Sequence, residues 1–127
     1  MDSILTSIKK MLGIQEDYEH FDTDLILHIN SVLMTVTQIG VGPAEGFAIQ
    51  DKTAVWADLT NDEKKLNSVK SFVYLKVKLL FDPPANSAAM QSLKELASEF
   101  EWRLNVAAES TNPEGEEEIQ NVGIQQL

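Results

Sequence analysis

The sequence predicts an all-α, single-domain bundle of about four helices, with a Gly/Pro-containing loop between helices two and three and an acidic C-terminal tail. Three observations predict this fold. Four segments repeat apolar residues at the three- and four-residue spacing of an amphipathic helix. Glycine and proline separate the middle segments, which makes a continuous helix through the gap implausible. The chain has 127 residues, of which 43% are apolar, enough for one core in one domain.

The first expected helix runs from about Ser3 to Leu12. Its apolar positions follow the helical repeat: Ile4, Leu5, Ile8, Met11 and Leu12. Ser3 can cap the first turn, and Gly13 can adopt the left-handed conformation that ends a helix. A helix this short is not stable alone in water, so it has to pack against another element.

The second expected helix runs from about Thr23 to Gln38, capped by Asp22 or Thr23. Its wide apolar stripe consists of Leu25, Ile26, Ile29, Val32, Leu33, Val36 and Ile39. A stretch with three glycines and a proline follows, from Gly40 to Gly46. From Phe47 to Trp56, two short apolar pieces are consistent with either a small hairpin or a packed loop.

The third expected helix runs from a capping box at Thr60 to Glu63 as far as Phe81. It stops at Asp82-Pro83-Pro84, because proline lacks the amide donor and disfavours helical geometry in the residue before it. Apolar residues occupy more than one face of its second half, which predicts the central helix of the bundle.

The fourth expected helix runs from near Ser87 to about Ala108 or Glu109, which closes a helical domain at residues 1–109. The tail, residues 110–127, follows it. After Arg103 there are five acidic and no basic residues, half of the formal charge of −10. We expect this tail to be disordered when free, and to order on a partner through its spaced apolar residues Ile119, Val122, Ile124 and Leu127.

Composition and motifs exclude several classes of function. Without cysteine there is no disulfide scaffold or thiolate site, and a charge of −10 disfavours DNA binding through bulk charge. The chain has no apolar run of membrane-spanning length and no secretory signal, so we expect an intracellular protein without membrane contact. The pair Asp17 and His20 is not repeated as a dimetal site requires, and neither His20 nor His28 follows a nucleophile motif. We therefore expect no enzyme activity, no metal and no cofactor.

Two groups of residues are candidates for a partner interface. Five of the ten basic residues lie on the third helix: Lys64, Lys65, Lys70, Lys76 and Lys78. They form either a solvated face or a surface that meets acidic groups on a partner. Trp102 and Arg103 belong to residue types enriched among interface anchors. Because Trp102 is offset from the apolar stripe of its helix, it either covers an edge of the bundle or contacts a neighbour.

The layout resembles the small all-helical head-tail connector proteins (adaptor or head-completion proteins) of long-tailed phages. The shared features are the short first helix, the second helix opening after an acidic turn, and a Gly/Pro loop that contains Trp56. The most specific are the stop at Phe81-Asp82-Pro83-Pro84 and the late segment Phe100-Glu101-Trp102-Arg103-Leu104. The resemblance covers roughly residues 1–108, and the tail lies outside it.

This resemblance implies a structural virion protein that catalyses no reaction. Such proteins form a ring, usually dodecameric, beneath the portal protein at the head-tail interface. The ring extends the DNA channel, lets DNA pass without specific binding, and presents a platform to a stopper or tail-completion protein. An acidic ring can line a DNA channel without gripping the DNA.

A second class of function also fits the residues: a small helical regulatory or partner-binding module whose acidic tail docks on a basic protein. A ring-forming subunit associates head to tail through two different faces, whereas such a module is more often a monomer or a symmetric dimer. The mass of the protein with and without the portal distinguishes the two.

Overall fold

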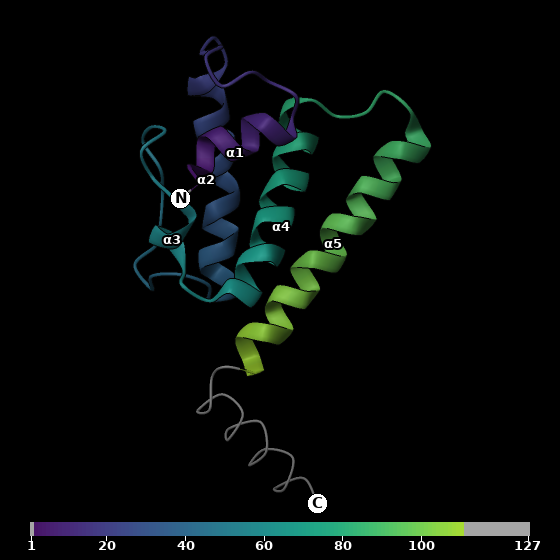
Figure 1. The fold of residues 1–127 in the computed structure, drawn as a ribbon. Helices are drawn as coiled ribbons and strands as arrows, with labels where there is room; N and C mark the ends of the chain where they lie inside the picture. The colour runs from purple at the N-terminus through teal and green to yellow at the C-terminus, as the bar shows by residue number, and fades with distance from the viewer. Residues whose placement is uncertain (1, 111–127) are drawn as a thin grey trace, which may run out of the picture.

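The computed structural model describes residues 2–110 and shows five helices in this part of the chain (Figure 1). They are α1 (Ile4–Met11), α2 (Asp22–Ile39), α3 (Trp56–Leu59), α4 (Glu63–Phe81) and α5 (Ser87–Ser110). No strand occurs among the described residues, and four of the helices are long enough to build a bundle. The predicted all-α fold is confirmed. The apolar tail residues Ile119, Val122, Ile124 and Leu127 lie outside the described part.

The ends of α1 are those that the sequence predicts. The Ser3 hydroxyl accepts a hydrogen bond from the Thr6 amide at 3.2 Å, and Gly13 has a φ of +82° just after the helix. The helix lies across α2 and α4, and it buries Ile4, Leu5 and Ile8 (Figure 1). Packing against longer helices therefore provides the stability that eight residues lack on their own.

A buried lysine in the last turn of α1, which sequence analysis did not single out, connects this helix to the chain that follows. Lys9 is only 2% exposed, and its Nζ donates to the carbonyl oxygens of Glu16 at 2.9 Å and Tyr18 at 2.7 Å. The same ammonium lies 2.9 Å from Oδ1 of Asp22. A buried charge is tolerated only where polar partners surround it, and here all three come from residues 16–22.

The start of α2 differs from the prediction because of this ion pair. Asp22 is the first residue of the helix rather than its cap, and Phe21 occupies the cap position without a side-chain hydrogen bond. The carboxylate that could have capped the helix contacts Lys9 instead. At the other end, Gly40 stops α2 in the left-handed conformation, with a φ of +104°.

The segment between α2 and α3 is a packed loop, so the hairpin alternative is wrong. Its one β contact in the described chain is an isolated antiparallel bridge between Ser3 and Val55. The Asn30 side chain on α2 holds the loop by two hydrogen bonds to the backbone of Ile49, at 2.8 and 2.9 Å. The short helix α3 was not predicted. The Asp58 carboxylate caps it by accepting from the Val55 amide at 3.0 Å.

The predicted capping box of the third expected helix is wrong as well. The cap of α4 is Asp62, whose carboxylate accepts from the amides of Lys64 and Lys65. Thr60 ends α3, and its hydroxyl accepts from the Asp62 amide at 3.2 Å. The helix begins two residues later than a Thr60 cap would have placed it, and it ends at Phe81 as expected.

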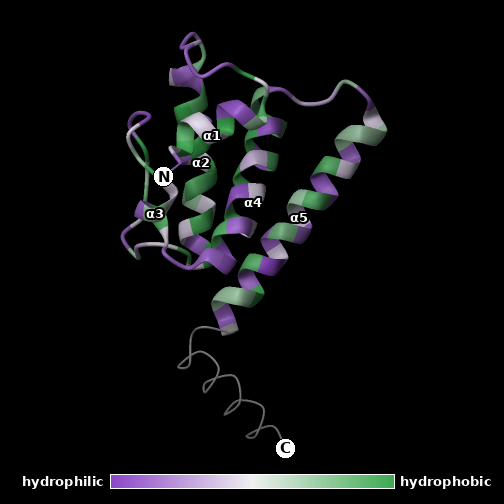
Figure 2. Ribbon diagram, in the orientation of Figure 1, coloured by the Kyte–Doolittle hydropathy of each residue, from purple (hydrophilic) through white to green (hydrophobic). Residues whose placement is uncertain are grey.

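The position of α4 at the centre of the bundle is confirmed. Val73 and Leu75 are both buried, although they point about 200° apart around a helix of 3.6 residues per turn. Figure 1 shows α2 on one side of α4 and α5 on the other. The Asn86 side chain caps α5 by accepting from the amides of Ala88 and Ala89, and Ala97 and Leu104 are buried on its inner face. Figure 2 shows apolar and polar residues alternating along α5, as expected for a helix at the edge of a bundle.

We predict that Lys9→Met destabilises the fold by about 3 kcal/mol, the low end of the range for breaking a buried ion pair. Asp22 keeps some contact with water, which limits the cost, but two backbone carbonyl groups lose their donor. The measurement is the free energy of unfolding from urea titration followed by circular dichroism. Lys10→Met is the matched control, because Lys10 is exposed and should change stability by less than about 0.5 kcal/mol. Equal effects of the two substitutions would contradict the role assigned to Lys9.

Candidate partner interface

The outer face of α5 carries an exposed tryptophan. Trp102 is 65% exposed, and it points roughly 140–160° away from the inner-face residues Ala97 and Leu104 around the helix. Beside it, Arg103 pairs with Glu99 at 2.7 Å and lies 5.3 Å from the centre of the Phe100 ring. Exposed pairs of this kind contribute only about 0–1 kcal/mol. Because its side chain is 65% exposed, Trp102 does not cover an edge of the bundle that residues 2–110 form. Contact with a neighbour is the alternative that remains.

The five lysines of α4 do not share one face. Lys70 Nζ lies 5.9 Å from the centre of the Trp56 ring, and Lys78 pairs with Asp82 at 2.9 Å. Lys64 is exposed near the start of the helix, whereas Lys65 and Lys76 are half-buried. An interface through these lysines stays a prediction, and it would have to use different lysines for different contacts.

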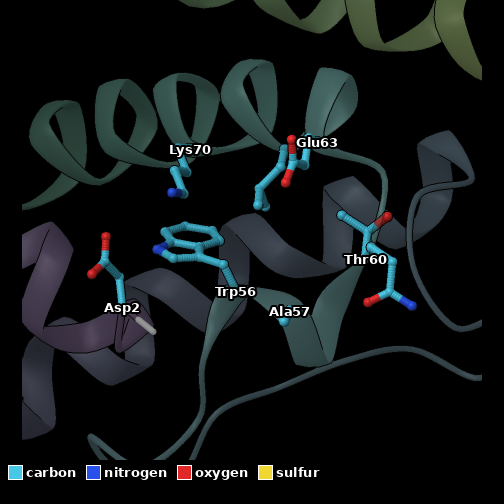
Figure 3. Close-up of a pocket in the computed structure, with 8 residues that line it drawn as sticks. Asp2, Trp56, Ala57, Thr60, Glu63 and Lys70 are labelled. Atoms are coloured by element: carbon cyan, nitrogen blue, oxygen red, sulfur yellow. The ribbon is translucent and has the colours of Figure 1, made fainter.

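A pocket of about 320 Å³ lies between α3 and the first half of α4 (Figure 3). Asp2, Trp56, Ala57, Thr60, Asn61, Glu63, Leu66 and Lys70 line it. Glu63, Leu66 and Lys70 share one face of α4, at the spacing of three and four residues that a helix requires. Figure 3 shows α4 between this pocket and α5, the helix that carries Trp102.

Hydrogen bonds with α1 and the residues before it fix the position of Trp56 at this pocket. The Trp56 indole is 2% exposed, and its Nε1 donates to the Ser7 hydroxyl at 2.8 Å. The Ile4 amide donates to the Ala54 carbonyl at 2.9 Å, and the Trp56 amide to the Asp2 carbonyl at 3.3 Å. Segments about 50 residues apart in the sequence therefore meet in a preformed site.

The electrostatics of this pocket are mixed. Asp2 and Glu63 contribute two carboxylates and Lys70 one ammonium. Within residues 2–110, neither carboxylate takes part in an ion pair. A second hollow of about the same volume, lined by Asp2, Ser3, Thr6, Ser7, Lys10 and Glu16, lies along α1. Both hollows share Asp2, and Trp56 lines the one between α3 and α4.

Sequence analysis missed two exposed apolar residues on α2. Leu27 and Met34 are 66% and 64% exposed, and they lie seven residues apart on the outer face of the helix. Their positions fall outside the apolar stripe, and that offset is the signal that could have identified them. The pocket gave no comparable signal, because its residues come from the N-terminus, α3 and α4.

Metal-ligating residue types do not gather in the described part of the chain. No cluster of three or more His, Asp or Glu side chains between residues 2 and 110 could hold a metal ion. His20 contacts the rings of Tyr18 and Phe21, and His28 lies 6.3 Å from the Phe81 ring. None of the five helices, over the residues the structure describes, is long and apolar enough to cross a membrane.

Residues 2–110 form a helical bundle with an exposed tryptophan on α5 and a pocket between α3 and α4. The model of the phage connector protein family matches residues 4–111, most of the chain. The protein therefore belongs to the phage connector protein family, a family of structural proteins. No curated protein and no solved structure matches the chain.

We predict that the two tryptophans respond very differently to a quencher. In Trp56→Phe only Trp102 fluoresces, and acrylamide should quench it strongly with emission at a long wavelength. In Trp102→Phe only the buried Trp56 remains, and quenching should be several-fold weaker. Acrylamide is chosen because, being neutral, it is not repelled by a chain of charge −10. The measurement is made at a dilution where the mass is that of one chain. Equal quenching of the two variants would contradict the exposure described here.

Proposed function

We propose that this protein is a head-tail connector, or adaptor, that forms a ring beneath the portal and joins the capsid to the tail. The observation that carries the proposal is the match to the phage connector protein family over residues 4–111. The chain is made in the host cytoplasm and becomes part of the virion at the head-tail interface. Its partners are further copies of itself, the portal protein, and a stopper or tail-completion protein.

The charge and the surface of the chain support this role. A ring of chains with a formal charge of −10 repels phosphate, so DNA passes through the channel without being held. The exposed side chain of Trp102 on the outer face of α5 suits a subunit that contacts a neighbouring copy. A dodecamer is the ring size that we expect.

The test is assembly with the portal protein of the same phage. We expect the mixture to sediment as one complex, with electron microscopy showing a ring of this chain at one end of the portal. A chain that stays monomeric and does not sediment with the portal would contradict the proposal and favour the small partner-binding module.

A chain ending at residue 110 tests the proposed role of the tail in the same assay. Residues 111–127 contain four glutamates and the apolar residues Ile119, Val122, Ile124 and Leu127. We propose that they attach to the portal or to a neighbouring subunit, where many weak contacts add up in a ring. The truncated chain should keep its unfolding temperature and lose affinity for the portal. Unchanged affinity would limit the tail to a role in solubility.

We also predict that reversing two lysines on α4, Lys64→Glu with Lys76→Glu, weakens assembly and removes part of its salt dependence. Charged contacts at the edge of an interface act over about 10 Å at 0.1 M salt, and salt screens them beyond that range. The control is Lys10→Glu with Lys52→Glu, two exposed lysines outside α4 that give the same change in net charge. Sedimentation measures assembly, and circular dichroism checks that helicity is retained. If both pairs have the same effect, the lysines of α4 form only a solvated face.

A further inference from the structure

We propose that Trp102 on α5 of one copy inserts into the pocket between α3 and α4 of the next copy, forming the contact that closes the ring. The inference rests on the proposed function, because it names the subunit contact within that ring. It starts from a protruding side chain and a pocket. One is an indole that the bundle leaves 65% exposed, and the other is a pocket of about 320 Å³ between α3 and α4.

The pocket is large enough to accept one side chain. Its volume of about 320 Å³ lies at the lower end of the range of about 300–1,000 Å³ for ligand sites. Leu66 and Ala57, which are both half-buried, provide apolar surface for an indole. Lys70 already lies over the Trp56 ring, so its ammonium can also contact the face of an entering ring.

The polar groups of the two surfaces are complementary. Trp102 has one donor, its Nε1–H, and Asp2 and Glu63 offer carboxylate acceptors that take part in no ion pair within residues 2–110. Arg103 follows Trp102 and is held only by the exposed pair with Glu99, so it can exchange that partner at little cost. A pocket with two carboxylates and one ammonium therefore faces an anchor flanked by a guanidinium.

The arrangement of the two surfaces produces a ring rather than a symmetric dimer. Figure 3 shows α4 between the pocket and α5, and Trp102 lies on the outer face of α5, so it does not reach the pocket of its own chain. A contact between two different faces is heterologous, and each added copy leaves one anchor and one pocket free for the next. The series ends only when the rotation between neighbours closes a ring.

The first test compares two equally exposed apolar side chains. We expect Trp102→Ala to weaken association between copies by about 30-fold or more, as for a buried aromatic anchor. Leu27→Ala, with 66% exposure on α2, should leave association unchanged. Sedimentation of each variant over a range of concentrations gives both values. If Leu27→Ala disrupts association and Trp102→Ala does not, the copies meet through α2 and the proposal is overturned.

The second test exchanges charges across the contact. Arg103→Glu places a third carboxylate against the pocket, and Glu63→Arg places a second guanidinium against Arg103, so each variant alone should associate more weakly. Mixing the two variants, or combining both substitutions in one chain, pairs opposite charges again and should restore association. Additive losses in the double variant would show that residues 63 and 103 do not meet.

A covalent test shows the same contact even if association is weak. The chain contains no cysteine, so the only thiols in Asn61→Cys/Asn105→Cys are the two introduced, one at the pocket and one beside Trp102. A short bis-maleimide should link this variant into a ladder of three or more chains, which Trp102→Ala in the same background abolishes. Ser31→Cys in place of Asn105→Cys is the control. A ladder that survives Trp102→Ala overturns the proposal.

These outcomes separate the contact from the proposed function. Rings that form on the portal with Trp102→Ala as well as with the unaltered chain refute the contact and leave the connector role intact. Association that depends on Trp102, without binding to the portal, supports the contact and refutes the connector role.

Discussion

The fold depends on the surroundings of a single ammonium group. Lys9 can be buried only because Glu16, Tyr18 and Asp22 present oxygen atoms to it, and these residues cover the connection from α1 to α2. The ion pair therefore fixes where α1 lies on the bundle. The start of α1 in turn forms hydrogen bonds with the backbone of Ala54 and Trp56, so the position of Trp56 also depends on where α1 lies.

The sequence predicts the elements whose signals are local. Ser3 and Gly13 bound α1, Gly40 ends α2, and the two prolines after Asp82 end α4, because each acts on the backbone within a few residues. The helix α3 could not be predicted in this way, since Trp56 is held by Ser7, which lies 49 residues earlier. Thr60 and Asp62 are both good caps, and the choice between them is made by α3, which uses Thr60 as its own end.

The same difference between local signals and long-range contacts applies to the candidate interface. The exposure of Trp102 follows from its offset on the helix, which the sequence contains. The pocket could not be predicted from the sequence, because Asp2, Trp56 and Glu63 meet only in the folded chain. The lysines of α4 form a group in the sequence that the structure separates. They cluster in the sequence, but a helix of 3.6 residues per turn distributes them around its surface, and Lys70 and Lys78 have separate partners.

The attachment of residues 41–55 has a consequence for how this protein can evolve. Asn30 recognises the backbone of Ile49 and not its side chain, and the contacts of Ala54 and Trp56 with α1 are also made by backbone groups. Only Val41 and Ile49 in this loop are fully buried. Most side chains of this loop can therefore be replaced during evolution while the backbone keeps the same path. The loop is where a phage can diversify this protein at little cost to its folding.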